Sequence, residues 1–343
     1  MYDNFNQQKH EIIMSEDERK SHKKLFSNLC FAYLAFILIA NGLSIVASLV
    51  LSETAPQLLE NGNFALILSS ALQYCIAFPI LVTMLSKIPS QAPSTNTLNA
   101  KSFRKYALAS VFIMYVGNYI SSFLMVNIES ALGYTPENAV DTILSSSNIV
   151  LSVILIGIVG PIIEELMFRK LFIDRLTPYG ELTAILIPSL IFGLFHANLY
   201  QFFYAFFLGA IFSYIYVKTG KIIYSTVLHI FINLFFGVLP AAIIQNLDYE
   251  QLIDMALAGN IPEEYITANI VPLSLLVIYE FITFALVFFG LFTFTRNVRN
   301  VTLNKGAIKF PKGTGADTVF FNAGAIILIT VCLILTAVNT FAA

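Results

Sequence analysis

The sequence predicts an all-α membrane protein, a polytopic bundle of about nine transmembrane helices. Of its 343 residues, 57% are hydrophobic and only 12% are charged, whereas soluble domains carry about 25% charged residues. Apolar runs near the roughly 20 residues that a helix needs to cross the hydrocarbon core recur along the chain. All 19 Lys and Arg residues fall in the N-terminal segment or in alternate connections between these runs.

The apolar runs give the expected helices in order. The first 24 residues are polar and predict a solvated tail or a short surface helix. Asn198 and Leu199 provide almost no loop between the fifth and sixth runs. The nine expected membrane spans are 25–51, 65–86, 106–128, 147–172, 182–199, 200–217, 222–244, 269–295 and 318–341.

The basic residues predict the orientation of the bundle. Lys and Arg are enriched on the cytoplasmic side of membrane proteins, so the N-terminus is expected inside and the C-terminus outside, with an odd number of spans. The external connection 245–268 is expected to contain a short helix, with Asp248 as its N-cap and Gln251 three positions on. The basic stretches are 1–24, 87–105, 169–175, 218–221 and 296–312, and the connections between them carry no Lys or Arg.

These boundaries divide the chain into four expected parts. They are a cytoplasmic tail at 1–24, three transmembrane helices at 25–146, a core of four at 147–241, and an external loop with two further helices at 242–343. We expect a multi-pass integral protein of the cell membrane, with the lipid bilayer as its first partner. The net charge of −2 and the absence of a basic face exclude nucleic acid as an expected partner.

Ionisable residues inside the spans are the candidates for function. A carboxylic acid at a helix centre costs about 2.5–3.5 kcal/mol on insertion scales, so such a residue is a functional candidate by default. A lone histidine on an apolar helix is more often a packing residue, but two histidines and two glutamates on three nearby spans favour a site. We expect Glu280, outside this region, to bond a neighbouring helix or to line a water path. The intramembrane candidates are Glu164, Glu165, His196, His229 and Glu280.

The two adjacent glutamates are expected to face different surroundings. Glu165 and Arg169 are four residues apart on one helix face, with the acid first, which is the favourable order for an ion pair. Glu164 lies about 100° around the helix from its neighbour and must face something else. If this span ends near Phe172, Glu164 lies about 12 Å inside the membrane. A cluster at the membrane surface explains Arg169 equally well, but it does not explain Glu164.

Each intramembrane histidine has a companion one helical turn away. The ring of Phe192 can pack against the imidazole of His196, and His229 shares a helix face with the carboxamide of Asn233. A carboxylate, two imidazoles and a carboxamide are consistent with three chemistries. They can hydrolyse a bond by activating water and holding an oxyanion, bind a catalytic zinc, or relay protons in a transporter.

Three motifs in this order resemble those of the CPBP family, the CAAX-protease and bacteriocin-processing membrane proteins, also called the Abi family. The resemblance covers about residues 147–241, and the segment between the last two motifs, 209–222, also resembles the family's linking sequence. The motifs are Glu164-Glu165-x-x-x-Arg169, Phe192-x-x-x-His196 and His229-x-x-x-Asn233.

The resemblance implies an intramembrane endopeptidase of helical fold that acts on a peptide or membrane-protein substrate. On the family's pattern, Glu164 matches the general base and His196 the residue that helps to activate water. His229 and Asn233 match the oxyanion-binding pair. The accessory positions, which hold the geometry of the site, are Glu165, Arg169 and Phe192.

Several alternatives stay open. The family has been described both as metalloproteases and as glutamate-dependent proteases. We favour no metal cofactor, because Asn233 is a poor ligand and a good donor; a zinc ion would instead be bound by Glu164, His196 and His229. A non-catalytic immunity or transport-assisting protein is the next interpretation, and a proton-coupled transporter the third. The compatible substrates are prenylated CAAX-type proteins, bacteriocin leader peptides, pheromone-like peptides and other membrane proteins.

The expected depths of the site residues disagree with one another. If its helix begins at Leu182, His196 lies roughly 21 Å from the cytoplasmic end, whereas Glu164 and His229 lie about 10–12 Å from it. A kink at Pro188 would reconcile these depths. On these depths we expect the site to open toward the cytoplasm.

Overall fold

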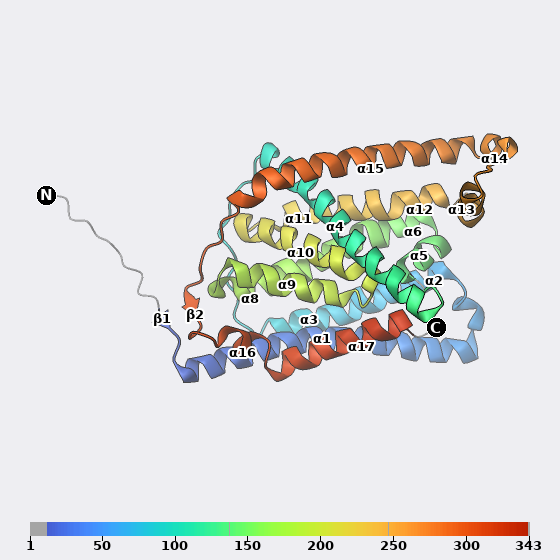
Figure 1. Ribbon diagram of the computed structural model, residues 1–343. Coiled ribbons are helices and arrows are strands. Elements are labelled where there is room, and N and C mark those ends of the chain that lie inside the picture. The colour runs from blue at the N-terminus through green and yellow to red at the C-terminus, as the bar shows by residue number, and fades with distance from the viewer. Residues whose placement is uncertain (1–11, 137, 246, 342–343) are drawn as a thin grey trace.

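The chain forms a nearly all-helical bundle in a computed structural model that describes residues 12–136, 138–245 and 247–341 (Figure 1). The predicted fold class is thereby confirmed. Residues 1–11 of the expected tail lie outside the described residues. Two two-residue strands, β1 (Ile12–Ile13) and β2 (Ile308–Lys309), pair in parallel, with Ile12 opposite Ile308.

Within the described ranges, eight helical segments are long and apolar enough to cross a membrane, which makes the chain a multi-pass integral membrane protein. The remaining expected span, 182–199, corresponds to α9 (Glu181–Phe195), an apolar helix of 15 residues. The eight segments are α1 (Glu16–Thr54), α2–η2–α3 (Gly62–Leu85), α4 (Ala100–Leu132), α6 through η5 (Ile149–Tyr179), α10 (Leu199–Thr219), α11–η6–α12 (Ile222–Ile244), α15–η7 (Ile270–Asn300) and α17 (Ala323–Phe341).

Short elements connect the long helices. The expected helix in the connection 245–268 is present as α13 (Tyr249–Leu257), and Asp248 caps it by accepting a hydrogen bond from the backbone N–H of Gln251. The helix α1 begins at Glu16, so the end of the expected tail is the exposed first part of this helix. The remaining short elements are η1 (Pro56–Leu58), α5 (Ala139–Ser146), α13 (Tyr249–Leu257), α14 (Glu263–Ala268) and α16 (Gly315–Val319).

Prolines distort three of the spans at defined places. A proline inside a helix removes one N–H and clashes with the preceding turn, and wide π-helical turns are a common response near functional sites. Here Pro79, Pro161 and Pro240 each occupy the first turn after a π-helical segment. These segments are η2 (Leu72–Ala77), η3 (Val153–Val159) and η6 (Asn233–Val238), and a fourth, η4 (Leu166–Ile173), follows the helical turn α7 (Gly160–Glu165).

The basic connections gather at one end of the bundle. The backbone N–H of Gln91 donates to Asp174 O at 2.6 Å, and that of Asn96 donates to Thr219 O at 2.8 Å. The carboxylate of Glu181 accepts from Lys218 Nζ and from the backbone and side chain of Asn304. We call this the basic end. The strand β1 lies at this end and the last turn of α17 at the other (Figure 1), as an odd number of crossings requires.

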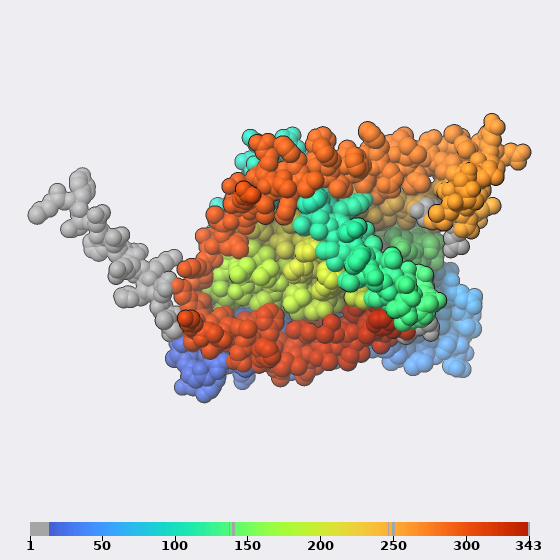
Figure 2. Space-filling model, in the orientation of Figure 1, coloured from blue at the N-terminus to red at the C-terminus, as the bar shows by residue number. Residues whose placement is uncertain are grey.

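The helix α9 lies in the middle of the bundle, with α1, α10 and α17 around it (Figure 1). On the face shown in Figure 2, α10 is visible only in the gap between α15, α4 and α17. Aromatic side chains fill the space between α1, η4 and α9, where Tyr33, Phe168 and Phe195 are in mutual ring contact. The core therefore encloses the segments that carry the motifs.

Candidate active site

A tight hairpin places Glu164 and His196 at the same level of the bundle. Glu164 lies fifteen positions before Tyr179, where its span ends, and His196 lies fifteen positions after Glu181, where α9 begins. Only Gly180 separates the two helices, and its φ of +99° suits a residue without a side chain. Two antiparallel arms of equal length therefore carry both side chains about 22 Å from the turn.

This hairpin corrects one expectation from the sequence. The span that carries Glu164 was expected to end near Phe172, but its helical turns continue to Tyr179. The expected depths of Glu164 and His196 disagreed because the end of the Glu164 span was placed too early. Pro188 does not break the helix, since it lies within the continuous helix α9.

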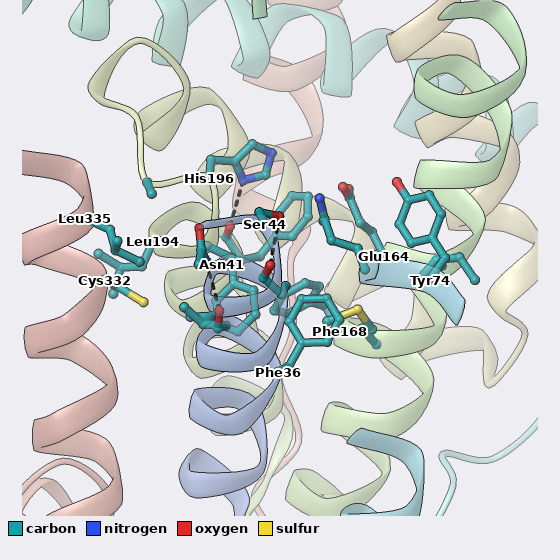
Figure 3. A pocket seen from close by; sticks show the side chains of 18 of the residues that line it. Phe36, Asn41, Ser44, Tyr74, Glu164, Phe168, Leu194, His196, Cys332 and Leu335 are labelled. Atoms are coloured by element: carbon teal, nitrogen blue, oxygen red, sulfur yellow. Dashed lines mark hydrogen bonds between the residues drawn. The ribbon is translucent and has the colours of Figure 1, made fainter. Parts of the chain in front are cut away.

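Two adjoining cavities meet at these two residues. A cavity of about 1120 Å³ is lined by all four residues that were predicted as catalytic, namely Glu164, His196, His229 and Asn233. A smaller cavity of about 300 Å³ shares Glu164, His196, Phe192 and Tyr74 with it and is shown in Figure 3. The structure therefore brings the four predicted residues together around one space.

Glu165 and Arg169 form the expected pair on the other helix face. Glu165 Oε1 and Arg169 Nη2 are 3.2 Å apart, and both side chains are fully buried. The guanidinium also lies 4.7 Å from the ring centre of Phe192 and 5.5 Å from that of Phe212, which are cation–π distances. Arg169 is thus held by one carboxylate and two rings, none of which is exposed to solvent.

His229 lies between the two glutamates. Its Nδ1 is 3.1 Å from Glu165 Oε1, and its Nε2 is 3.5 Å from Glu164 Oε2. An imidazole can donate through both nitrogens only in its charged form. Glu164, Glu165, His229 and Arg169 therefore form one connected chain of charged and polar groups, in which Glu164, with a side chain 33% exposed, borders the cavity.

His196 is fixed by its own helical turn. Its Nδ1 lies 2.9 Å from the carbonyl oxygen of Phe192, and the Phe192 ring meets the imidazole edge-on at 4.9 Å, as the spacing predicted. Since a carbonyl only accepts hydrogen bonds, Nδ1 carries the proton, and in the neutral imidazole Nε2 is left as an acceptor.

Asn233 begins the π-helical segment η6 and is bonded to another one. Its Nδ2 donates to the carbonyl oxygen of Ile156 in η3 at 3.0 Å. A carboxamide nitrogen has two N–H donors, so this bond orients the side chain and leaves a second donor for a ligand in the large cavity. The two π-helical segments η3 and η6, which precede Pro161 and Pro240, therefore meet at Asn233.

The turn after His196 is strained. Ala197 has a φ of +46° and is the one non-glycine residue with a positive φ in the described part of the chain. The left-handed region is unfavourable for a residue with a Cβ atom. Asn339 of α17 donates its Nδ2 to the carbonyl oxygen of Ala197 at 2.9 Å, and both residues line the smaller cavity.

Sequence reasoning missed some of the polar groups at the site. Tyr74 lines both cavities, and a Cβ atom at Gly160, one turn before Glu164, would lie 3.2 Å from the Tyr74 hydroxyl. The signal that could have found it is a tyrosine deep inside the second apolar run. Glu280 differs from expectation, since it is exposed on α15 and lines neither of the two cavities.

The large cavity extends away from the basic end. Asp141 of α5 and Gln245, after α12, are among its lining residues, and burial raises the pKa of Asp141, against the opposing hydrogen bond from Asn138. None of its described lining residues comes from a basic connection. The expected opening toward the basic end was therefore wrong.

The side chains do not form a set of metal ligands. Among the residues that the structure describes, no three His, Cys, Asp or Glu side chains are placed to hold a metal ion together. The two ring nitrogens of His229 lie near Glu165 and Glu164, respectively. In the described structure, Glu164, His196 and His229 are thus not grouped as ligands of a single ion.

The middle of the chain matches the model of a known protein family. Residues 146–235 match the model described as "Type II CAAX prenyl endopeptidase Rce1-like". The matched range includes every residue predicted as catalytic or accessory, and it confirms the resemblance to the CAAX-protease family.

Two curated bacterial proteins are similar over a longer range. "UPF0177 protein YxdF" of Lactococcus lactis subsp. lactis (strain IL1403) is 27% identical over 145 residues, which are 41% of this chain and 81% of that protein. "Putative membrane peptidase YdiL" of Bacillus subtilis (strain 168) is 25% identical over 200 residues, which are 58% of this chain and 82% of that protein. No solved structure matches the chain.

Proposed function

We propose that this chain, whose residues 146–235 match the type II CAAX prenyl endopeptidase model, is an intramembrane endopeptidase. The observation that carries the proposal is the convergence of Glu164, His196, His229 and Asn233 on one cavity between membrane-spanning helices. Buried ionisable groups are unfavourable inside a membrane, and this set has the parts that peptide hydrolysis needs. The catalytic unit is the expected core, residues 147–241.

Glu164 is the general base. Its carboxylate takes a proton from a water molecule that the Nε2 atom of His196 orients, and the resulting hydroxide attacks the carbonyl carbon of the peptide bond. The protonated Glu164 then gives its proton to the leaving nitrogen as the C–N bond breaks. Glu164 suits this role because it is the one of the two adjacent glutamates that borders the cavity.

His229 and Asn233 bind the oxyanion. Asn233 and His229 both line the cavity, and donors fixed before the reaction stabilise developing negative charge most effectively. Glu165 holds the Nδ1 side of His229, and Arg169 holds Glu165. These two residues and Phe192 therefore act by keeping the donors in place.

The substrate is a peptide segment associated with the membrane. CAAX-type prenylated proteins are the class that the description of the family model names, and bacteriocin or other leader peptides are a second class, proposed from the motif resemblance. A cavity of about 1120 Å³ between the helices has room for several residues of an extended chain.

Peptide profiling of membranes tests this function without a known substrate. Glu164→Gln keeps the shape of the side chain and removes the base, so peptides released by the wild-type chain should be absent while expression and thermal unfolding are unchanged. Glu280→Gln is the matched control, because it makes the same change in a span at a residue that lines neither cavity. Identical peptide profiles from wild type and Glu164→Gln would contradict the proposal.

The metal question is tested on the same purified samples. We expect activity to persist after treatment with chelators, with no stoichiometric zinc bound. Zinc that is lost together with activity, and that restores activity when added back, would replace the glutamate mechanism with the metal alternative.

A further inference from the structure

The side chains around Glu164 are packed on one side and open on the other. Toward the basic end, the residues one and two turns from Glu164 on the same helix face are Phe168 and Phe172, which are 2% and 0% exposed. Toward the other end, the corresponding residues are Gly160 and Ile156, and both line the large cavity. The helix that carries the proposed base is therefore packed against its neighbours on the basic-end side of Glu164 and borders the cavity on the other side.

The helix that carries the oxyanion pair has the same asymmetry. One turn from His229 toward the basic end lies Ser225, which is 0% exposed. In the other direction Asn233, Gly237 and Ile244 all line the cavity. Two helices that run in opposite directions thus agree on where the open side lies, so the asymmetry belongs to the bundle and not to one helix.

Contacts close the basic end itself. Tyr179 and Phe310 are stacked at 5.5 Å, with their rings within 6° of parallel, and His22 Nδ1 lies 2.6 Å from the Tyr179 hydroxyl. Tyr216 donates to Asp174 Oδ1 at 2.7 Å in the buried layer between this end and the site. None of the residues in these contacts lines the large cavity.

We infer that substrate reaches this site from the end opposite the basic connections. Since Lys and Arg mark the cytoplasmic side, that end faces outside the cell. The inference rests on the proposed function for its substrate, which is then a segment exposed on the external face of the membrane, such as an exported peptide or the outer part of a membrane protein. Of the substrate classes proposed above, external access therefore favours leader peptides and the outer parts of membrane proteins over prenylated proteins that stay in the cytoplasm.

Cysteine labelling in intact cells tests the direction of access. In a chain whose cysteines, Cys30, Cys75 and Cys332, are replaced by alanine, one new cysteine is introduced at Gly237. This position lines the cavity, and a Cβ atom there would meet nothing within 4 Å. A membrane-impermeant maleimide added outside should label Gly237→Cys in intact cells, whereas the same reagent should not label it when applied to the cytoplasmic face of inside-out vesicles.

Two matched cysteines control the experiment. Ser94→Cys lies in an exposed basic connection and should be labelled only from the cytoplasmic face. Ser225→Cys lies on the same helix as position 237 but is buried on the closed side, and it should be labelled from neither face. Thermal unfolding of each variant establishes that it is folded.

The outcomes separate this inference from the proposed function. Labelling of position 237 from the cytoplasmic face, or of position 94 from outside, overturns the inference, and neither result bears on whether Glu164 is a base. External labelling combined with a peptide profile that does not depend on Glu164 supports the access route and removes the peptidase.

Discussion

Glu164 and Glu165 are neighbours in the sequence with different surroundings, and this difference indicates their roles. Glu165 is fully buried against Arg169 and His229, whereas Glu164 borders the cavity. A charged group that is buried and paired cannot easily take up a proton, because its partner holds it in the charged state. Glu164, which is half-buried at the cavity, is therefore the glutamate that can exchange protons with water.

Removing the carboxamide of Asn233 should lower turnover without unfolding the protein. Loss of one oxyanion donor typically lowers kcat by about 10²–10³, and we expect this range for Asn233→Ala, with little change in KM. Kinetics on a peptide identified by the profiling experiment provide the measurement. Asn127→Ala, which removes a carboxamide bonded to the backbone on the exposed face of α4, should retain wild-type turnover.

Removing the charge of Glu165 should destabilise the fold. Glu165→Gln leaves Arg169 buried without its carboxylate, and breaking a buried ion pair on one side costs on the order of 3–5 kcal/mol. The midpoint of thermal unfolding in detergent should fall accordingly. The double variant Glu165→Gln with Arg169→Gln should recover much of this loss and remain inactive; a double variant less stable than the single one would contradict this account of the pair.

Local contacts at the site were predictable from sequence, and distant ones were not. The Glu165–Arg169 pair and the Phe192–His196 contact follow from spacing by one helical turn, which fixes the geometry within a helix. The contact between His229 and Glu165 joins residues 64 positions apart, so it depends on how the helices pack. Tyr74 was missed for the same reason.

At the scale of elements, a residue of another helix, α17, stabilises the turn between α9 and α10. Asn339→Ala removes the hydrogen bond to the carbonyl oxygen of Ala197, the residue with the strained backbone. A neutral hydrogen bond contributes about 0.5–1.5 kcal/mol, so kcat should fall roughly two- to tenfold as His196 loses its fixed position, with KM nearly unchanged.

A second substitution decides whether Asn339 acts through this turn. Glycine adopts a positive φ without strain, so Ala197→Gly combined with Asn339→Ala should restore turnover. If the double variant is no faster than Asn339→Ala alone, Asn339 acts in some other way, for example as a polar group of the smaller cavity.

The spans themselves were predictable, but their distortions and one of their ends were not. Apolar length predicted nearly every long helix, because the bilayer sets that length. It gave no sign that Thr177–Tyr179 continues the helical turns beyond Phe172, since these residues are polar or amphipathic. The prolines at 161 and 240 were visible, but which turns would widen depends on the packing of η3 against η6.

At the scale of the whole molecule, the orientation in the membrane is a prediction to be measured. Reporter fusions after residues 24, 95, 220 and 305 should report the cytoplasm, and fusions near 57, 255 and 343 the outside, because the basic connections stay inside. A fusion that reports the side opposite to the one expected for it would contradict the alternation. The fusions test the orientation of the bundle independently of the cavity.

The hairpin around Gly180 makes the protein sensitive to changes of length in one place. Glu164 and His196 meet because both arms count fifteen residues from the turn. One residue inserted between Gly180 and His196 would rotate the imidazole by about 100° and shift it by 1.5 Å along the helix axis. An insertion beside Gly259, in the connection 245–268, would change neither arm. Within 164–196, relatives that keep the activity should therefore differ by substitution and never by insertion or deletion.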